Sequence, residues 1–217
     1  MTSTILAYGD SLTFGANPET GGPRHAYEDR WPTALERALD GKARVIAEGL
    51  GGRTTAFDDL TVGADRNGAR ILPTLLESHK PLDLVIIMLG TNDIKPYVCG
   101  SAAFAARGAR RLIELTGGHF AATGEPVPQV LLVSPPHATP TTNEIMLSNF
   151  GGLEHLLLES RDFAPHYRRH ASETGAAFFD ASTVAVASPL DGVHLDPANT
   201  RAIGEGLAPL VKQILGL

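Results

Sequence analysis

Cysteine is almost missing from this chain, which holds only Cys99 among its 217 residues. One cysteine excludes an intramolecular disulfide framework and a cysteine-based zinc cluster, and it is compatible with a reducing compartment. The sequence also lacks a basic start followed by an apolar stretch and a small-residue cleavage site, and no apolar run approaches the ~18 residues of a membrane span. We therefore expect a cytoplasmic protein with no membrane partner.

Runs of lysine or arginine are absent too, and the net charge is −6 with a pI near 5.7. Such a surface offers no electrostatic footprint for nucleic acid or anionic lipid, so we expect no nucleic-acid partner. Hydrophobic residues make up 43% of the chain, which is enough to fill one complete core. We predict a single domain that spans residues 1–217.

Short β-rich apolar runs alternate with longer amphipathic ones along the chain, which is typical of a parallel sheet covered by helices on both faces. Strands are predicted over residues 4–8, 44–47, 82–89, 129–133 and 177–179. Helices are predicted over residues 31–39, 68–78, 101–115, 161–174 and 197–215. The pattern predicts an α/β fold, a three-layer αβα sandwich with a flavodoxin-like, five-stranded parallel sheet.

Two connections, residues 16–30 and 135–160, are too long for simple turns, and loops of this length usually have a function. We expect both to lie over the active-site end of the sheet. The second is rich in apolar residues: Ile145, Met146, Leu147, Phe150 and residues 156–158. Exposed on a monomer, these side chains would form a sizeable patch, which favours a subunit interface. Packing of the loop on its own domain is the alternative.

Polar residues gather where the predicted strands end, and in an open parallel sheet that edge is where sites form. Four of these groups are Gly9-Asp10-Ser11, the glycine-rich residues 49–54, the Gly-Thr-Asn-Asp of residues 90–93, and the Ser-Pro-Pro-His of residues 134–137. A fifth, the Asp-Gly-Val-His of residues 191–194, precedes the last predicted helix. Together they supply a hydroxyl, an amide, an imidazole and a carboxylate, the groups of a serine hydrolase.

The GDSL near the N-terminus, the glycine of the second group, the GTND and the DGVH resemble, in the same order, the four motif blocks of the SGNH (GDSL) hydrolase superfamily. The stretches VIAEGLGGRTTAFDD and PLDLVIIMLGTNDIK are most similar to the bacterial arylesterase and acyltransferase group, mycobacterial members included. The resemblance implies a serine ester hydrolase that needs no metal and no cofactor. It also implies a homo-oligomer, with an octamer as the leading expectation.

The residue types favour the same chemistry, because a serine needs a base within hydrogen-bond reach and donors for the developing oxyanion. Ser11 is the predicted nucleophile and His194 the predicted base. Asp191, three residues before the histidine, can accept the imidazole Nδ1 proton within one tight turn. Asp180 is a rival for that acid. By the resemblance, the oxyanion donors are the Ser11 and Gly52 backbone N–H groups and the Asn92 amide.

Residues beside these motifs are predicted to contact the substrate: Asp10, Leu12, Phe14, Thr91, His137 and Val193. Asp10 is expected to orient its turn, Asp93 to accept loop amides, and Arg53 with Thr54 to hold the second loop. Phe14 and Ala16 stand where the relatives tend to carry bulkier aromatics, which predicts a wider acyl pocket and weaker acyl transfer. The remaining histidines lack a carboxylate at a useful spacing and fit solvated or core positions.

We expect an esterase that acts through an acyl-enzyme on small acyl groups such as acetyl and propionyl, on aryl or carbohydrate esters, with some acyl transfer to alcohols. A thioesterase or lysophospholipase would use the same residues, and the motifs do not separate them. A flavodoxin-like binding module should carry a Ser/Thr-rich phosphate loop, and a metallophosphoesterase should carry Asp-x-His near the start. The sequence has neither feature.

Overall fold

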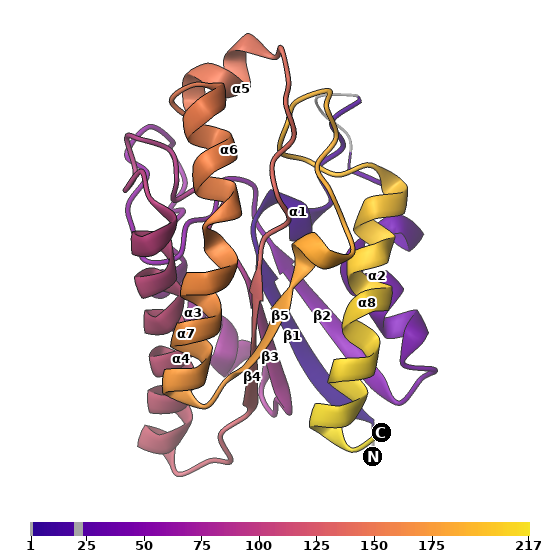
Figure 1. Ribbon diagram of the computed structural model, residues 1–217. Helices are drawn as coiled ribbons and strands as arrows, with labels where there is room; N and C mark the ends of the chain where they lie inside the picture. The colour runs from indigo at the N-terminus through magenta and orange to yellow at the C-terminus, as the bar shows by residue number, and fades with distance from the viewer. Residues whose placement is uncertain (1, 20–23) are drawn as a thin grey trace.

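The computed structural model describes residues 2–19 and 24–217, and it shows one twisted sheet between two layers of helices (Figure 1). The strands pair in parallel in the order β2-β1-β3-β4-β5. They are β1 (Ser3–Gly9), β2 (Ala43–Gly49), β3 (Leu84–Met88), β4 (Gln129–Ser134) and β5 (Ala177–Asp180). The α-helices are α1 (Ser11–Phe14), α2 (Trp31–Ala38), α3 (Gly68–His79), α4 (Ala102–Thr123), α5 (Glu144–Asn149), α6 (Leu153–Arg161), α7 (Phe163–Thr174) and α8 (Pro197–Leu215).

Strand β3 lies in the middle of the sheet, and all five of its residues are buried. Leu84 and Ile86 belong to the core under α2 and α8, whereas Val85 and Ile87 belong to the core under α3, α4 and α7. Because helices cover both faces, successive side chains are apolar on either side, and the strand is one continuous apolar run. The predicted αβα sandwich with a five-stranded parallel sheet is confirmed.

Several predicted boundaries are wrong in the second half of the chain. Helix α4 continues to Thr123, eight residues beyond the predicted end, because Phe120 is only 2% exposed and packs into the core. The predicted loop 135–160 contains α5 and most of α6, and α7 starts at Phe163 because α6 occupies the chain up to Arg161. Of the first long connection, Tyr27–Asp29 form a 3-10 helix and residues 20–23 lie outside the described residues.

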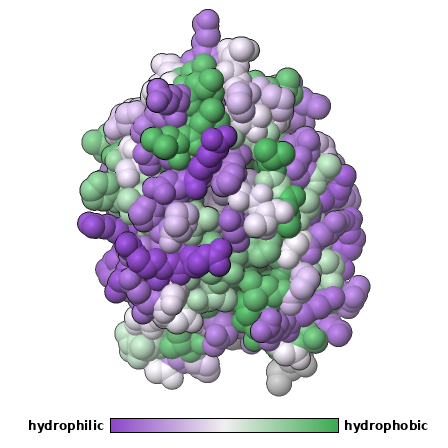
Figure 2. All heavy atoms as spheres, in the orientation of Figure 1, coloured by the Kyte–Doolittle hydropathy of each residue, from purple (hydrophilic) through white to green (hydrophobic). Residues whose placement is uncertain are grey.

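The apolar patch predicted on residues 145–158 is smaller than expected. Phe150 and Leu156 are 2% and 1% exposed, because they complete the core between the sheet and α4 and α7. Ile145 and Leu158 are 75% and 65% exposed. Figure 2 shows apolar atoms at the upper end of the molecule, over α5 and α6, broken up by hydrophilic ones. The loop therefore packs largely on its own domain and leaves a few exposed apolar side chains.

Membrane-spanning helices are not found in residues 2–19 and 24–217: none of the helices there is both long and apolar enough.

Candidate active site

The strand order places two of the predicted motifs side by side. After β1 the chain adds β2 on one side and then returns to add β3 on the other, so the connections diverge between β1 and β3. Such a switch point leaves an opening at the carboxyl ends of the two strands. Ser11 follows β1 and Asn92 follows β3.

Ser11 is the first residue of the four-residue helix α1, directly after the strand. Asp10 is the N-cap, and its Oδ1 accepts the Leu12 N–H at 2.9 Å. Gly9 permits this sharp turn, because a Cβ there would lie 1.9 Å from Thr13 Oγ1. The Thr13 hydroxyl is itself held by Trp31 Nε1 at 3.1 Å. The Gly-Asp-Ser sequence thus ends the strand at once and presents the serine at a helix N-terminus.

His194 joins Ser11 to Asp191. Its Nε2 lies 3.0 Å from Ser11 Oγ, and its Nδ1 lies 2.6 Å from Asp191 Oδ2. Asp191 Oδ1 also accepts the backbone N–H groups of Val193 and His194, at 3.0 and 2.9 Å, which fixes the tight turn. Since a carboxylate only accepts, Nδ1 carries the proton and Nε2 is left to accept the serine hydroxyl.

The side chains of Asp191 and His194 are 11% and 20% exposed. Burial alone would raise the pKa of Asp191, but the His194 hydrogen bond and charge and the two backbone amides hold this pKa below its usual value. The carboxylate is therefore ionised at neutral pH. A carboxylate in this position can stabilise an imidazolium and fix the ring orientation.

The three predicted oxyanion donors follow the neighbouring strands β1, β2 and β3. Gly52 has a φ of +81°, a conformation that favours glycine. Among the described residues, the backbone N–H groups of Ser11 and Gly52 donate to no backbone carbonyl in the turns, loops and caps. Asn92 Nδ2 donates to the Arg53 carbonyl oxygen at 3.1 Å and lies a longer 3.4 Å from Asp10 Oδ2. The shorter hydrogen bond, to Arg53, orients the Asn92 amide. The longer one, to Asp10, is weak, so the second amide hydrogen can donate to a ligand.

Two buried carboxyl groups lie behind these donors. Asp10 is 1% and Asp93 0% exposed. Burial raises the pKa of Asp10 to about 6, although the Leu12 amide and the charges of His194, Arg53 and Lys95 oppose the shift. Burial also raises the pKa of Asp93 to about 7, against hydrogen bonds from Thr55. The guanidinium carbon of Arg53 lies 4.2 Å from the centroid of the Tyr8 ring, and its Nη1 donates to the Gly9 carbonyl oxygen at 2.8 Å.

Two hollows border the site. An apolar cavity with room for about 10 Å³ is lined by Leu12, Thr91 and Val193, the neighbours of Ser11, Asn92 and His194. Thr91 Oγ1 has no hydrogen-bond partner among the described residues. A second opening, a cleft of about 380 Å³, is lined by Ala16, Asn17, Pro18, Asn143, Ile145, Met146, Asp191 and His194. Ile145 and Met146 of α5 line this cleft, although the sequence analysis assigned them to a subunit interface and not to the substrate site.

Other predicted site residues lie apart from these hollows. The Phe14 ring stacks under the Arg24 guanidinium at 4.0 Å, and His137 is half-buried in a β-bridge with Val186. Neither lines the cavity or the cleft. Asp180, the rival acid, caps the turn that follows β5 by accepting the Ser182 N–H at 3.0 Å.

Four of the other histidines do contact a carboxylate, contrary to the prediction from their spacing. The pairs are His79 with Glu48, His119 with Glu77, His166 with Asp162, and His170 with Glu173. Only the Asp191–His194 pair also reaches a serine hydroxyl among the described residues. In the same residues no cluster of three or more His, Cys, Asp or Glu side chains is arranged to hold a metal ion.

The chain matches the GDSL-like lipase/acylhydrolase family over residues 7–202. A carbohydrate acetylesterase family member from Sinorhizobium meliloti is 49% identical, with both chains covered in full and a TM-score of 0.94. A proposed arylesterase from Agrobacterium tumefaciens is 50% identical, with 99% of this chain and 100% of that chain covered and a TM-score of 0.90. The M. smegmatis aryl esterase is 39% identical over the same shares, with a TM-score of 0.91. No curated protein matches the chain.

Proposed function

The chain belongs to the GDSL-like lipase/acylhydrolase family and is a carboxylic ester hydrolase, and on this premise we propose that Ser11 is its nucleophile, His194 its general base and Asp191 the acid that orients the imidazole. The observation that carries this proposal is the continuous chain of hydrogen bonds, 3.0 Å from Ser11 Oγ to Nε2 and 2.6 Å from Nδ1 to Asp191. The same geometry defines the serine hydrolase triad on unrelated folds.

Acylation begins when Ser11 Oγ attacks the ester carbonyl carbon and its proton moves to His194 Nε2. The tetrahedral intermediate collapses, the carbon–oxygen bond to the alcohol breaks, and His194 returns the proton to the departing oxygen. Water then attacks the acyl carbon and gives its proton to His194; the bond from that carbon to Ser11 Oγ breaks, His194 returns the proton to Oγ, and the acid leaves. In both steps the negative oxygen would be held by the Ser11 and Gly52 N–H groups and by Asn92.

The acyl group is proposed to enter the apolar cavity beside Leu12, Thr91 and Val193. Its free space of about 10 Å³ is close to the minimum for one water molecule. An acetyl methyl therefore fits with little rearrangement, whereas each further methylene must displace packed side chains. Acetyl and propionyl esters are the substrates that this space supports best.

The alcohol is proposed to lie in the 380 Å³ cleft beside His194, which combines the apolar Ile145 and Met146 with the amides of Asn17 and Asn143. Such a lining suits an aryl alcohol or a sugar hydroxyl. An alcohol bound in this cleft could also take the acyl group in place of water. Ala16, one wall of the cleft, leaves space for water, so we expect hydrolysis to exceed transfer.

The proposal is tested with a panel of aryl and sugar esters from acetyl to octanoyl, together with a thioester and a lysophospholipid. We expect kcat/KM to be highest for acetyl esters and to fall with each added methylene. Ala16→Trp should raise the ratio of transfer to hydrolysis when an alcohol is added, because the indole excludes water. A preference for octanoyl esters or for the lysophospholipid would contradict the proposed substrate class.

We also propose a homo-oligomer, with an octamer as the leading expectation, in the cytoplasm. The exposed Ile145 and Leu158 support contact between subunits, and the lone Cys99 fits a reducing compartment. Native mass measurement should give a multiple of the 22.9 kDa chain mass. A monomer at micromolar concentration would contradict this part alone.

A further inference from the structure

The loop that carries Gly52 and the turn that carries Asn92 are joined by two neighbouring bridges. In the first, Asn92 Nδ2 donates to the Arg53 carbonyl oxygen at 3.1 Å. In the second, Asp93 accepts the Thr55 N–H at 3.0 and 3.1 Å with its two carboxylate oxygens, and the Thr55 hydroxyl at 2.5 Å. The second bridge ties the loop that carries Gly52 to the turn that carries Asn92, next to both proposed oxyanion donors.

Close packing against α3 and α4 fixes the position of Thr55. Thr55 and Asp93 are both fully buried. Gly108 of α4 makes room for the hydroxyl, because a Cβ there would lie 1.9 Å from Thr55 Oγ1. Gly68 at the start of α3 makes room for the backbone, since its Cβ would lie 2.8 Å from the Thr55 carbonyl oxygen. Helices α3 and α4 therefore pack closely against this loop and keep Thr55 next to the Asp93 carboxylate.

Asp93 is also tied to the turn that follows it. Its carbonyl oxygen accepts the N–H groups of Cys99 and Gly100, at 3.2 and 2.9 Å, and its own N–H donates to the Gly90 carbonyl oxygen at 2.9 Å. The backbone of Asp93 is thus fixed from both sides, and its side chain transmits that position to Thr55. A buried carboxyl group is costly compared with an apolar pair of similar size, so stability alone does not account for it.

We propose that Asp93 and Thr55 are positioning residues that set the separation between the Gly52 N–H and the Asn92 amide in the oxyanion hole. This inference rests on the proposed function, because it concerns the same intermediate. Neither residue touches the substrate. Both act on kcat, because donors that are misplaced by a fraction of an ångström bind the developing oxyanion less well while the ester itself binds unchanged.

The test compares Thr55→Val, which removes the hydroxyl at nearly constant shape, with Thr55→Ser, which keeps it. We expect Thr55→Val to lower kcat by about tenfold with KM changed less than about twofold, and Thr55→Ser to recover most of kcat. Thr116→Val is the matched control, because Thr116 is equally buried and its hydroxyl donates to the Leu112 carbonyl oxygen within α4. That variant should keep the wild-type kcat.

A double-mutant cycle with Asn92→Ala separates positioning from general damage. In the Asn92→Ala background, Thr55→Val can displace only the Gly52 N–H. The fold-loss of kcat that Thr55→Val causes there should therefore be less than about half of the fold-loss that it causes in the wild-type background. An equal factor in both backgrounds, or an unchanged kcat in Thr55→Val, would overturn the inference. An unchanged kcat in Asn92→Ala alone would instead overturn the proposed oxyanion hole.

If Thr55→Val does not fold, Asp93→Asn takes its place, because the amide keeps the size of the carboxyl group and one acceptor oxygen. The cycle and the expected split between kcat and KM are the same. Circular dichroism and active-site titration establish the folded fraction to which each kcat is referred.

Discussion

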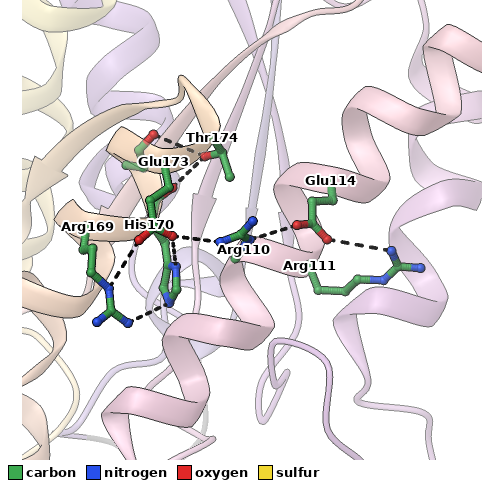
Figure 3. Close-up of polar contacts among 8 residues, drawn as sticks. Arg110, Arg111, Glu114, Arg169, His170, Glu173 and Thr174 are labelled. Atoms are coloured by element: carbon green, nitrogen blue, oxygen red, sulfur yellow. Dashed lines mark hydrogen bonds and ion pairs between the residues drawn. The ribbon is translucent and has the colours of Figure 1, made fainter.

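Two pairs of histidine and carboxylate in this protein have the same three-residue spacing and different surroundings. His170 Nδ1 lies 3.2 Å from Glu173 on α7, and His194 Nδ1 lies 2.6 Å from Asp191 in the loop before α8. Figure 3 shows the first pair in a network of exposed arginines and glutamates between α4 and α7. In the first pair, the second imidazole nitrogen, His170 Nε2, lies 3.5 Å from Arg169 Nη2. In the second pair, the same nitrogen of His194 lies 3.0 Å from Ser11 Oγ.

The carboxylates differ as much as the second partners do. Glu173 is 44% exposed and is shared with Arg110 at 2.8 Å, whereas Asp191 is 11% exposed and is held by two backbone amides. The His170 side chain is itself only 7% exposed, but water and salt reach its carboxylate partner and screen the interaction between the two. Spacing in the sequence therefore identifies a histidine–carboxylate pair, and a buried carboxylate together with an adjacent serine hydroxyl makes it a candidate catalytic pair.

The largest contrast is expected from replacing each histidine. His194→Ala should lower kcat by about 10⁴-fold or more, because Ser11 loses the base that takes its proton. His170→Ala should leave kcat within about twofold, since that imidazole faces an arginine. Steady-state kinetics on a phenyl acetate-type ester checks both. Comparable losses in the two variants would show that the difference in surroundings has no catalytic meaning.

The carboxylates give the next contrast. Asp191→Asn should lower kcat by about 10³ to 10⁴-fold, less than removal of the imidazole, because an amide favours the wrong tautomer and the base still works in part. Glu173→Gln should leave kcat unchanged. A His194→Gln protein as active as wild type, or an Asp191→Asn protein as active as Glu173→Gln, would contradict the assigned roles.

A smaller loss is expected from the oxyanion donor that has a side chain. Asn92→Ala should lower kcat by about 10² to 10³-fold, or about 3 kcal/mol of transition-state stabilisation, with little change in KM. Asn67→Ala is a matched control, because Asn67 is 7% exposed and its side chain caps α3 by accepting the Ala69 N–H at 3.0 Å. It should reduce thermal stability and leave kcat intact. A loss confined to KM in Asn92→Ala would assign this amide to substrate binding.

The smallest effect concerns stability and pH. The pKa values of Asp10 and Asp93 are raised to about 6 and about 7, so between pH 4 and 7 the folded protein binds more protons than the unfolded chain. Stability from these two groups therefore falls as the pH rises through this window. Asp191, with its lowered pKa, acts in the opposite sense and loses its contribution only as the pH falls below the ordinary carboxyl range.

Thermal denaturation of wild type and Asp93→Asn from pH 4 to 8 measures this difference. We expect the variant to gain stability relative to wild type as the pH rises from 4 to 7, because it has no buried carboxyl group to ionise there. A difference between the two proteins that is the same at every pH would contradict the raised pKa of Asp93.

The strands and the catalytic motifs could be predicted because their signals are local. An apolar run such as residues 84–88 or a turn such as Asp191 to His194 is specified by neighbouring residues. The role of Thr55 could not be found in this way, because it depends on Asp93, 38 residues further along, and on space left by Gly108. The burial of Phe150 and Leu156 likewise depends on the core they meet, and short helices such as α5 have weak periodicity.

The central claim is that Ser11, and no other serine, is the nucleophile. Intact-mass spectrometry after incubation with a fluorophosphonate tests it directly, because the reagent bonds covalently to a serine activated by an adjacent base. Wild type and His170→Ala should each gain the mass of one adduct, and Ser11→Ala should gain none. Labelling of Ser11→Ala to the same extent as wild type would contradict the claim.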